Sequence, residues 1–118
     1  MPRTLSSSVK VFYPKHNREE IIQFIKDALP KLQEQLSLKL VVLFGSYAKG
    51  NYTVASDIDL LIVYSGSNRD DAFALCKRTL GIPRLEPHVY SVKEYQESKR
   101  TVGHMIKDSI ILIGSSSV

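Results

Sequence analysis

Residues 41–63 read VVLFGSYAKGNYTVASDIDLLIV, two apolar runs joined by a polar loop. The first run lies in the short, β-branched segment 38–44, which predicts a strand covered on both faces. The second run predicts a strand over residues 57–64. Asp57 and Asp59 stand at the front of this second strand. Because burying an unpaired charge is costly, the two carboxylates there need a partner such as a cation.

The length and composition indicate one folded domain spanning residues 1–118. The chain has 118 residues, of which 43% are hydrophobic and 24% charged, enough for a single modest core. The polar ends, residues 1–8 and 115–118, are expected to fray. No apolar run reaches the length of a membrane span, and the N-terminus lacks a signal-peptide pattern. We therefore expect a cytoplasmic protein without a membrane partner.

The charges and the cysteine content exclude several classes of site. The net charge of +4 comes from basic residues spread along the whole chain, which argues against a basic tail that binds nucleic acid but not against a basic patch assembled by folding. Cys76 is the only cysteine, so an internal disulfide and a four-cysteine zinc site are both excluded. Its apolar neighbours predict a buried core thiol.

Apolar spacing, capping residues and turns predict the remaining elements, which alternate between helix and strand. They are a helical segment over 17–36, a helix over 69–80, a strand over 84–91, a helix over 91–100, a helical turn over 104–108 and a strand over 109–113. Because Pro30 interrupts the first segment, either one kinked helix or two abutting helices fits it. Pro87 makes the strand over 84–91 an edge or bulged strand. The apolar segment 110–113 is expected to be a core strand, the alternative being an interface in a homo-oligomer.

Gly45 and Ser46 follow the first strand directly and turn into a short helical segment. Such a turn aims backbone N–H groups at a ligand above the strand end and favours phosphate oxygens, to which the Ser46 hydroxyl adds a donor. A plain turn is the alternative interpretation. Gly45 and Gly50 have the spacing of a P-loop, but Asn51 and Tyr52 replace the required Lys and Ser or Thr, which excludes a Walker A motif.

Alternate side chains on a strand share a face, so Asp57 and Asp59 point the same way while the residues between them point into the core. Two adjacent carboxylates are explained by a divalent cation, usually Mg²⁺, bound between them and a substrate phosphate. Solvated turn residues are the alternative. Glu86, on the next predicted strand, is the best-placed third carboxylate for a two-metal site, and His88 shares its face.

The segments GSYAKG (45–50) and SDIDLLIV (56–63) together resemble the GSxAxG…SDxDLxV signature of the DNA polymerase β-like nucleotidyltransferases. The short chain is similar to the minimal nucleotidyltransferase (MNT) group of that superfamily. The resemblance implies an α/β (α+β) fold, a small mixed β-sheet with helices mainly on one face.

The resemblance also implies roles for individual residues. Gly45 and Ser46 would hold the triphosphate of a nucleoside triphosphate, ATP by preference, and Asp57 and Asp59 would bind Mg²⁺. Glu86 takes the place of the third acid, which is more often Asp in the family. Two further residues of the motif, Lys49 and Ser56, are candidates for nucleotide binding.

The function implied is an Mg²⁺-dependent transfer of a nucleotide, AMP by preference, from the triphosphate to an acceptor hydroxyl. Minimal members commonly pair with a helical HEPN-type protein as a toxin–antitoxin pair, so such a protein is the expected partner. Two alternatives stay open. Because Glu86 departs from the commoner Asp, the chain could be a non-catalytic module that neutralises a partner by binding it. It could also be a transferase acting on a small molecule or an RNA end.

Overall fold

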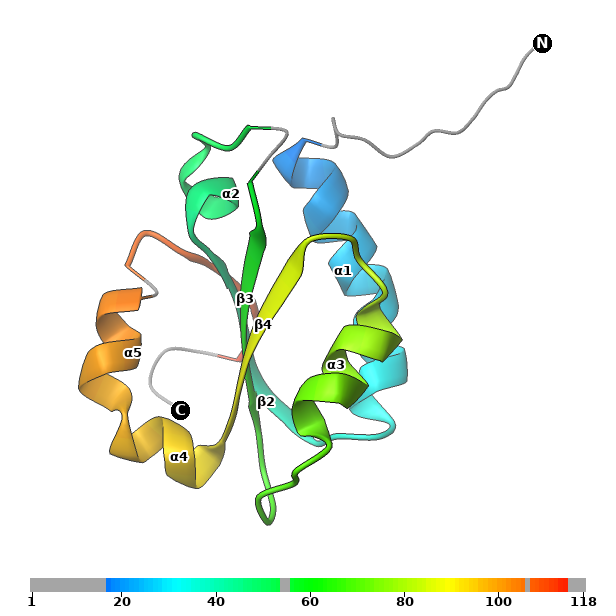
Figure 1. The fold of residues 1–118 in the computed structure, drawn as a ribbon, viewed down its shortest axis with the longest axis vertical. Coiled ribbons are helices and arrows are strands. Elements are labelled where there is room, and N and C mark those ends of the chain that lie inside the picture. Colours follow the sequence, from blue (N-terminus) through cyan, green and yellow to red (C-terminus); the bar gives the residue numbers. More distant parts are fainter. Residues whose placement is uncertain (1–16, 54–55, 106, 115–118) are drawn as a thin grey trace, which may run out of the picture.

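The computed structural model describes residues 17–53, 56–105 and 107–114. In chain order the helices and strands are α1 (Arg18–Gln33), β2 (Leu38–Phe44), α2 (Ser46–Lys49), β3 (Ile58–Tyr64), α3 (Ala72–Leu80), β4 (Leu85–Ser91), α4 (Val92–Glu97), α5 (Lys99–Met105) and β5 (Ile110–Ile113) (Figure 1). The ends that were expected to fray lie outside the described residues.

The strands form one mixed, four-stranded sheet in the order β4-β3-β2-β5. β2 pairs antiparallel with both β3 and β5, whereas β3 and β4 run parallel. The predicted strands are confirmed to within a residue or two. β4 lies at an edge of the sheet, where the missing N–H of Pro87 is tolerated. β5 pairs with β2 as a strand of the same sheet, as expected.

The sheet is covered unequally on its two faces, which Figure 1 shows with the sheet seen nearly edge-on. α1 and α3, the two longest helices, lie side by side on one face, and α4 and α5 pack on part of the other. The prediction of a small mixed sheet with helices mainly on one face is therefore confirmed. The layer on the other face consists of the short helices α4 and α5, whose buried side chains include Tyr95 and Val102.

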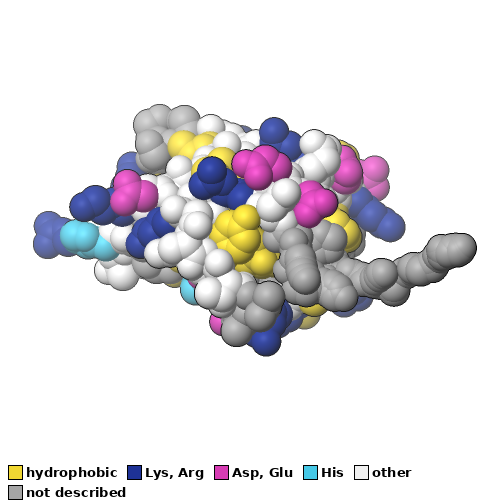
Figure 2. Space-filling view, turned by 90° about the horizontal axis from the view of Figure 1, so that it is seen from above, with side chains coloured by type: hydrophobic (Ala, Val, Ile, Leu, Met, Phe, Trp, Pro, Cys, Tyr) yellow, Lys and Arg dark blue, Asp and Glu magenta, His cyan; other side chains and the backbone are white. Residues whose placement is uncertain are grey.

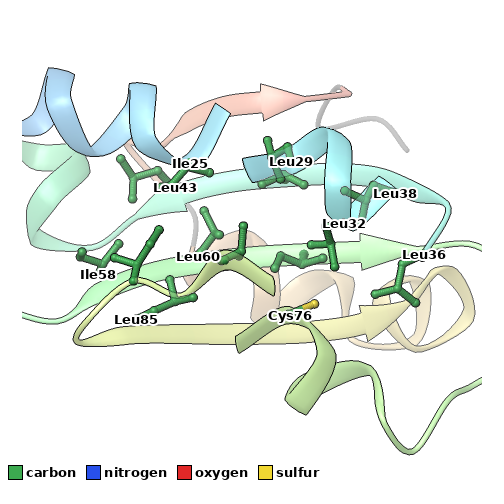
Figure 3. Packing of buried hydrophobic residues seen from close by; sticks show 14 of the residues in the cluster. Ile25, Leu29, Leu32, Leu36, Leu38, Leu43, Ile58, Leu60, Cys76 and Leu85 are labelled. Atoms are coloured by element: carbon green, nitrogen blue, oxygen red, sulfur yellow. The ribbon is translucent and has the colours of Figure 1, made fainter. Parts of the chain in front are cut away.

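Strand alternation divides the core into two clusters. The larger one joins α1 and α3 to one face of the sheet; Ile25 and Leu32 of α1 belong to it with the strand residues Leu43 and Leu60, and Figure 3 shows Ile25 next to Leu43. All four side chains are buried. The smaller cluster, on the opposite face, packs under α4 and α5. Because the central strands bury side chains on both faces, only their ends can carry polar groups.

Two capping boxes fix where helices begin. The side chain of Asn17 accepts from the N–H of Glu20 at 2.9 Å, and the Glu20 carboxylate accepts from the N–H of Asn17 at 3.0 Å. Ser91 and Glu94 make the same reciprocal pair at the start of α4. Each pair satisfies two backbone donors that the first helical turn would otherwise leave open.

The prediction of one helix over 91–100 is wrong in its extent. α4 ends at Glu97, because Ser98 leaves the helical conformation with φ −109° and ψ 16°, and a separate helix, α5, begins at Lys99. Of the helical turn predicted over 104–108, His104 and Met105 are the end of this second helix, residues 107–108 form a turn, and residue 106 lies outside the described residues. Within the described residues, no helix is both long and apolar enough to cross a membrane.

Cys76 gives a test of how tightly α3 packs on the sheet. Its side chain is fully buried, and burial raises the pKa of the thiol to about 12. We expect a thiol reagent at about pH 8 to label the protein only when it unfolds. Because the folded-state pKa is raised, the contribution of the thiol to stability is complete below the ordinary value of 9.0 and is lost as the pH rises toward the folded value. The free energy of unfolding, measured with a chemical denaturant, should therefore fall more steeply with rising alkaline pH for the native protein than for Cys76→Ala. Equal slopes for the two proteins, or rapid labelling of the folded protein, would contradict this packing.

Candidate active site

The predicted site residues meet at one end of the sheet, where β2 ends and β3 and β4 begin. Phe44 and Asp59 are partners across the β2–β3 pair, and Asp59 and Glu86 are partners across the β3–β4 pair. Asp57 lies immediately before β3. Figure 2 looks down on this end of the molecule, where acidic and basic side chains surround a central hydrophobic group.

Gly45 forms the turn between β2 and α2 in a conformation that favours glycine. Its φ is 78° and its ψ −156°, a region that residues with a side chain avoid. A Cβ atom built at this position would collide with the Oδ2 atom of Asp59. The sequence therefore needs glycine here for two reasons, the backbone angle and the close approach of the neighbouring carboxylate.

α2 is a single turn that follows directly from Gly45. The N–H of Lys49 bonds to the carbonyl of Gly45 at 3.1 Å, and the N–H of Gly50 bonds to that of Ser46 at 3.0 Å. The first N–H groups of a helix have no acceptor within the helix, so α2 itself offers no acceptor to those of Ser46 and its successor Tyr47. Tyr47 itself is buried and stacks on Tyr52, with ring centroids 4.3 Å apart. Its role in the turn is packing.

The two aspartates have different surroundings. The side chain of Asp57 is 54% exposed, and its Oδ1 lies 3.6 Å from Nη1 of Arg84. The side chain of Asp59 is 29% exposed, and its Oδ1 lies 3.6 Å from Nε2 of His88. Glu86 is exposed beside Asp59. Each aspartate thus has a nitrogen-bearing neighbour from the segment that begins β4.

The electrostatics of the site favour a cation near Asp59. Partial burial raises the pKa of the Asp59 carboxyl above its ordinary value, His88 opposes that rise, and the negative charges of Asp57 and Glu86 add to it. The carboxylates are therefore close enough to repel one another. A bound positive charge would relieve both the repulsion and the loss of hydration.

Lys49 and Ser56, the other residues predicted to bind the nucleotide, have different surroundings. Lys49 is exposed at the end of α2. The hydroxyl of Ser56 accepts from the N–H of Thr53 at 2.8 Å, and the N–H of Ser56 bonds to the carbonyl of Thr53 at 3.1 Å. Ser56 therefore closes the loop before β3, and its role toward a nucleotide stays a prediction, as does that of Lys49.

Two neighbours of the acids were not among the predicted catalytic residues. His88 could be placed on the face of Glu86 from strand alternation, but its approach to Asp59 depends on the β3–β4 register. Arg84 has a left-handed φ of 64° at the turn into β4, and its carbonyl accepts from the N–H of Ile58 at 2.9 Å. No sequence pattern marks that conformation in a non-glycine residue.

The carboxylates at this end of the sheet suit a cation that binds a substrate as well as the protein. Among the described residues, no group of three or more His, Cys, Asp and Glu side chains is arranged to hold a metal ion by itself. Mg²⁺, however, is commonly bound by one or two carboxylates together with substrate phosphates and water. Asp59 lies beside the turn at Gly45, and the charge of Asp57 acts on it from two residues earlier, an arrangement that fits that mode of binding.

Comparison with known proteins settles the family. A sequence profile described as "Nucleotidyltransferase domain" matches residues 19–114, which include the whole sheet and the acids. The chain belongs to the nucleotidyltransferase domain family. The predicted resemblance is thereby confirmed, and Gly45, Asp57 and Asp59 lie within the matched region.

Individual relatives agree with this assignment. The chain is 42% identical over 64 residues to the candidate protein adenylyltransferase MJ0604 of Methanocaldococcus jannaschii, a match that covers 54% of this chain and 62% of that protein. The chain thus spans less than two thirds of the length of this relative.

Solved structures share the fold at lower identity. A crystal structure of a candidate nucleotidyltransferase from Sulfolobus solfataricus superposes with a TM-score of 0.54 at 20% identity, covering 80% of both chains. A chain of a toxin–antitoxin crystallised with AMP-PNP superposes with a TM-score of 0.53 at 17% identity, covering 78% of this chain and 75% of that one. These likenesses show the nucleotidyltransferase fold.

Replacing Gly45 should separate backbone strain from the contact with Asp59. Gly45→Ala places a methyl group against the Asp59 carboxylate, whereas Gly66→Ala, also at a positive φ, meets open space. Both variants carry a backbone cost of about 1–3 kcal/mol. We expect Gly45→Ala to lose clearly more stability in urea unfolding than Gly66→Ala. Equal losses would show that Asp59 does not constrain position 45.

Replacing Asp59 should stabilise the ligand-free protein. The pKa of Asp59 is raised on folding, so its charged form opposes folding once the pH exceeds the ordinary carboxyl value of about 4. Asp59→Asn removes that charge and should raise the melting temperature at neutral pH, with the difference vanishing in acid. Asp70→Asn, at an exposed site before α3, serves as the control. A lower melting temperature for Asp59→Asn at neutral pH would contradict the raised pKa.

Proposed function

We propose that this protein is a metal-dependent protein adenylyltransferase, which transfers AMP from ATP to a hydroxyl group of a partner protein. The observation that carries the proposal is the approach of the Asp59 carboxylate to the turn at Gly45, with a second acid, Asp57, two residues before Asp59. Family membership supports nucleotidyl transfer, and the resemblance to a candidate protein adenylyltransferase supports a protein acceptor.

The reaction divides into roles for residues of this chain. The acceptor oxygen attacks the α-phosphorus, the bond from that phosphorus to its bridging oxygen breaks, and pyrophosphate leaves. The N–H groups that follow Gly45, with the hydroxyl of Ser46, orient the phosphates. Asp57 and Asp59 would hold Mg²⁺ in the two-metal arrangement expected from the sequence. Bound there, Mg²⁺ supplies positive charge that acidifies the acceptor hydroxyl and offsets the charge of the leaving pyrophosphate.

Glu86 is the group proposed to take the proton of the acceptor. It lies on β4 in register with Asp59, and its exposure leaves it accessible to a hydroxyl approaching from outside the sheet. A general base must come within hydrogen-bonding distance of the proton it removes, a requirement that an exposed side chain on an edge strand can meet when the acceptor docks.

The partner proposed is a helical HEPN-type protein whose hydroxyl-bearing side chain is the acceptor. This part of the proposal rests on the sequence resemblance to minimal nucleotidyltransferases, and the likeness of the fold to a chain of a toxin–antitoxin complex is consistent with it. A protein acceptor would have to be presented at the end of the sheet where the acids lie.

Titration calorimetry with ATP and Mg²⁺ tests the nucleotide site. We expect binding that requires the metal, and we expect Asp57→Asn and Asp59→Asn to abolish it while Asp70→Asn leaves it intact. Glu86→Gln should still bind but transfer AMP about 10²–10⁴ times more slowly, the size of the contribution that a general base typically makes.

Mass spectrometry of a HEPN-type partner after incubation with ATP and Mg²⁺ tests the transfer. The expected product carries one added AMP less one water per modified hydroxyl. Nucleotide binding without any increment on a protein would leave a transferase for small molecules or RNA ends. Binding of the partner without any nucleotide binding would identify a non-catalytic neutralising module.

A further inference from the structure

His88 lies in the site but has no part in the proposed reaction. It belongs to β4, and its ring packs against that of Phe44 on β2, with centroids 5.1 Å apart and planes inclined by 59°. Because β3 separates these two strands and neighbouring strands lie about 4.8 Å apart, the strands themselves are roughly 10 Å apart. Both rings must therefore lean over β3 to meet.

This packing places the imidazole beside Asp59, which lies on the strand between the two rings. Nε2 of His88 is 3.6 Å from Oδ1 of Asp59. The other oxygen, Oδ2, faces the Cα of Gly45, since a Cβ atom added to that glycine would collide with it. The carboxylate is thus bounded on one side by the imidazole and on the other by the backbone at Gly45.

We propose that His88 is a positioning residue that sets the orientation of the Asp59 carboxylate for a metal–nucleotide complex. This inference rests on the proposed function and adds a residue to it. The separation of 3.6 Å exceeds an ordinary hydrogen bond, but such contacts are often long in the free protein and shorten in the loaded one. A neutral imidazole that carries its proton on Nε2 donates to Oδ1 and leaves the remaining lone pairs of the carboxylate for the cation.

The role of Phe44 follows from the same geometry. Its side chain is buried at 7% exposure, whereas the His88 side chain is 35% exposed. The buried ring of Phe44 limits rotation of the imidazole away from Asp59. The orientation of the carboxylate is then set before the ligand arrives, and less conformational freedom is lost on binding.

The test measures the affinity of the protein for Mn²⁺ with AMP-PNP by electron paramagnetic resonance, at one fixed pH for all variants. We expect His88→Ala to weaken that affinity by about 10-fold or more, the effect of losing a group that orients a metal ligand. His88→Gln, whose amide N–H can replace Nε2–H, should recover most of the loss. His104→Gln on α5 is the matched control and should bind as the native protein does.

The outcomes separate this inference from the proposed function. Native-like affinity in His88→Ala, or equal weakening in His88→Ala and His88→Gln, overturns the positioning role while the function stands. A ¹⁴N coupling between the imidazole and Mn²⁺ also overturns it, because His88 would then be a ligand. If the native protein binds no metal–nucleotide complex, the proposed function and this inference both fail. If His88→Ala does not fold, His88→Asn replaces it, because its shorter amide ends before Asp59.

Discussion

The approach of the Gly45 backbone to the Asp59 carboxylate constrains the whole active end of this protein. It can form only if β2 and β3 pair in the observed register, if position 45 lacks a side chain and if the backbone there has a positive φ. The same contact brings the turn that presents N–H groups next to the acids. The proposed phosphate site and the proposed metal site would therefore both depend on this one strand pairing.

Burial of the strand centres explains why the acids lie at an end of the sheet. The centres of β2 and β3 are buried on both faces, where carboxylates would lose hydration without compensation. At the end of the sheet Asp57 keeps about half of its exposure, whereas Asp59 keeps less and has a raised pKa as a result. The ligand-free site is thus electrostatically unfavourable in the way expected of a site that binds cations.

Much of this arrangement could be predicted from local sequence patterns. The apolar runs around residues 41–63 predicted the two central strands, Asn17 and Ser91 marked helix starts, and alternation placed Asp57 and Asp59 on one face. The break at Ser98 could not be predicted, because it depends on the dihedral angles of one residue within a helix-forming segment.

Like the break at Ser98, the contacts made by β4 could not be predicted from the sequence. β3 and β4 are parallel and are joined through α3, so their register is set by how that helix packs and no tight turn fixes it. The approach of His88 to Asp59 and of Arg84 to Asp57 both depend on that register. The faces of the strands were accessible from the pattern, whereas the strand order and these partner atoms required the three-dimensional pairing.

The alternation of acids and apolar residues along β3 has a consequence for folding fidelity. A slip of one residue in the pairing of β3 would exchange its two faces. Asp57 and Asp59 would then be driven toward the hydrophobic layer beneath α1 and α3, while Ile58 and Leu60 would lose their packing there. Mispaired states would thus carry both an unpaired buried charge and lost apolar burial. The two aspartates proposed to hold the metal would therefore also make misregistered pairing of the sheet less stable than the native pairing.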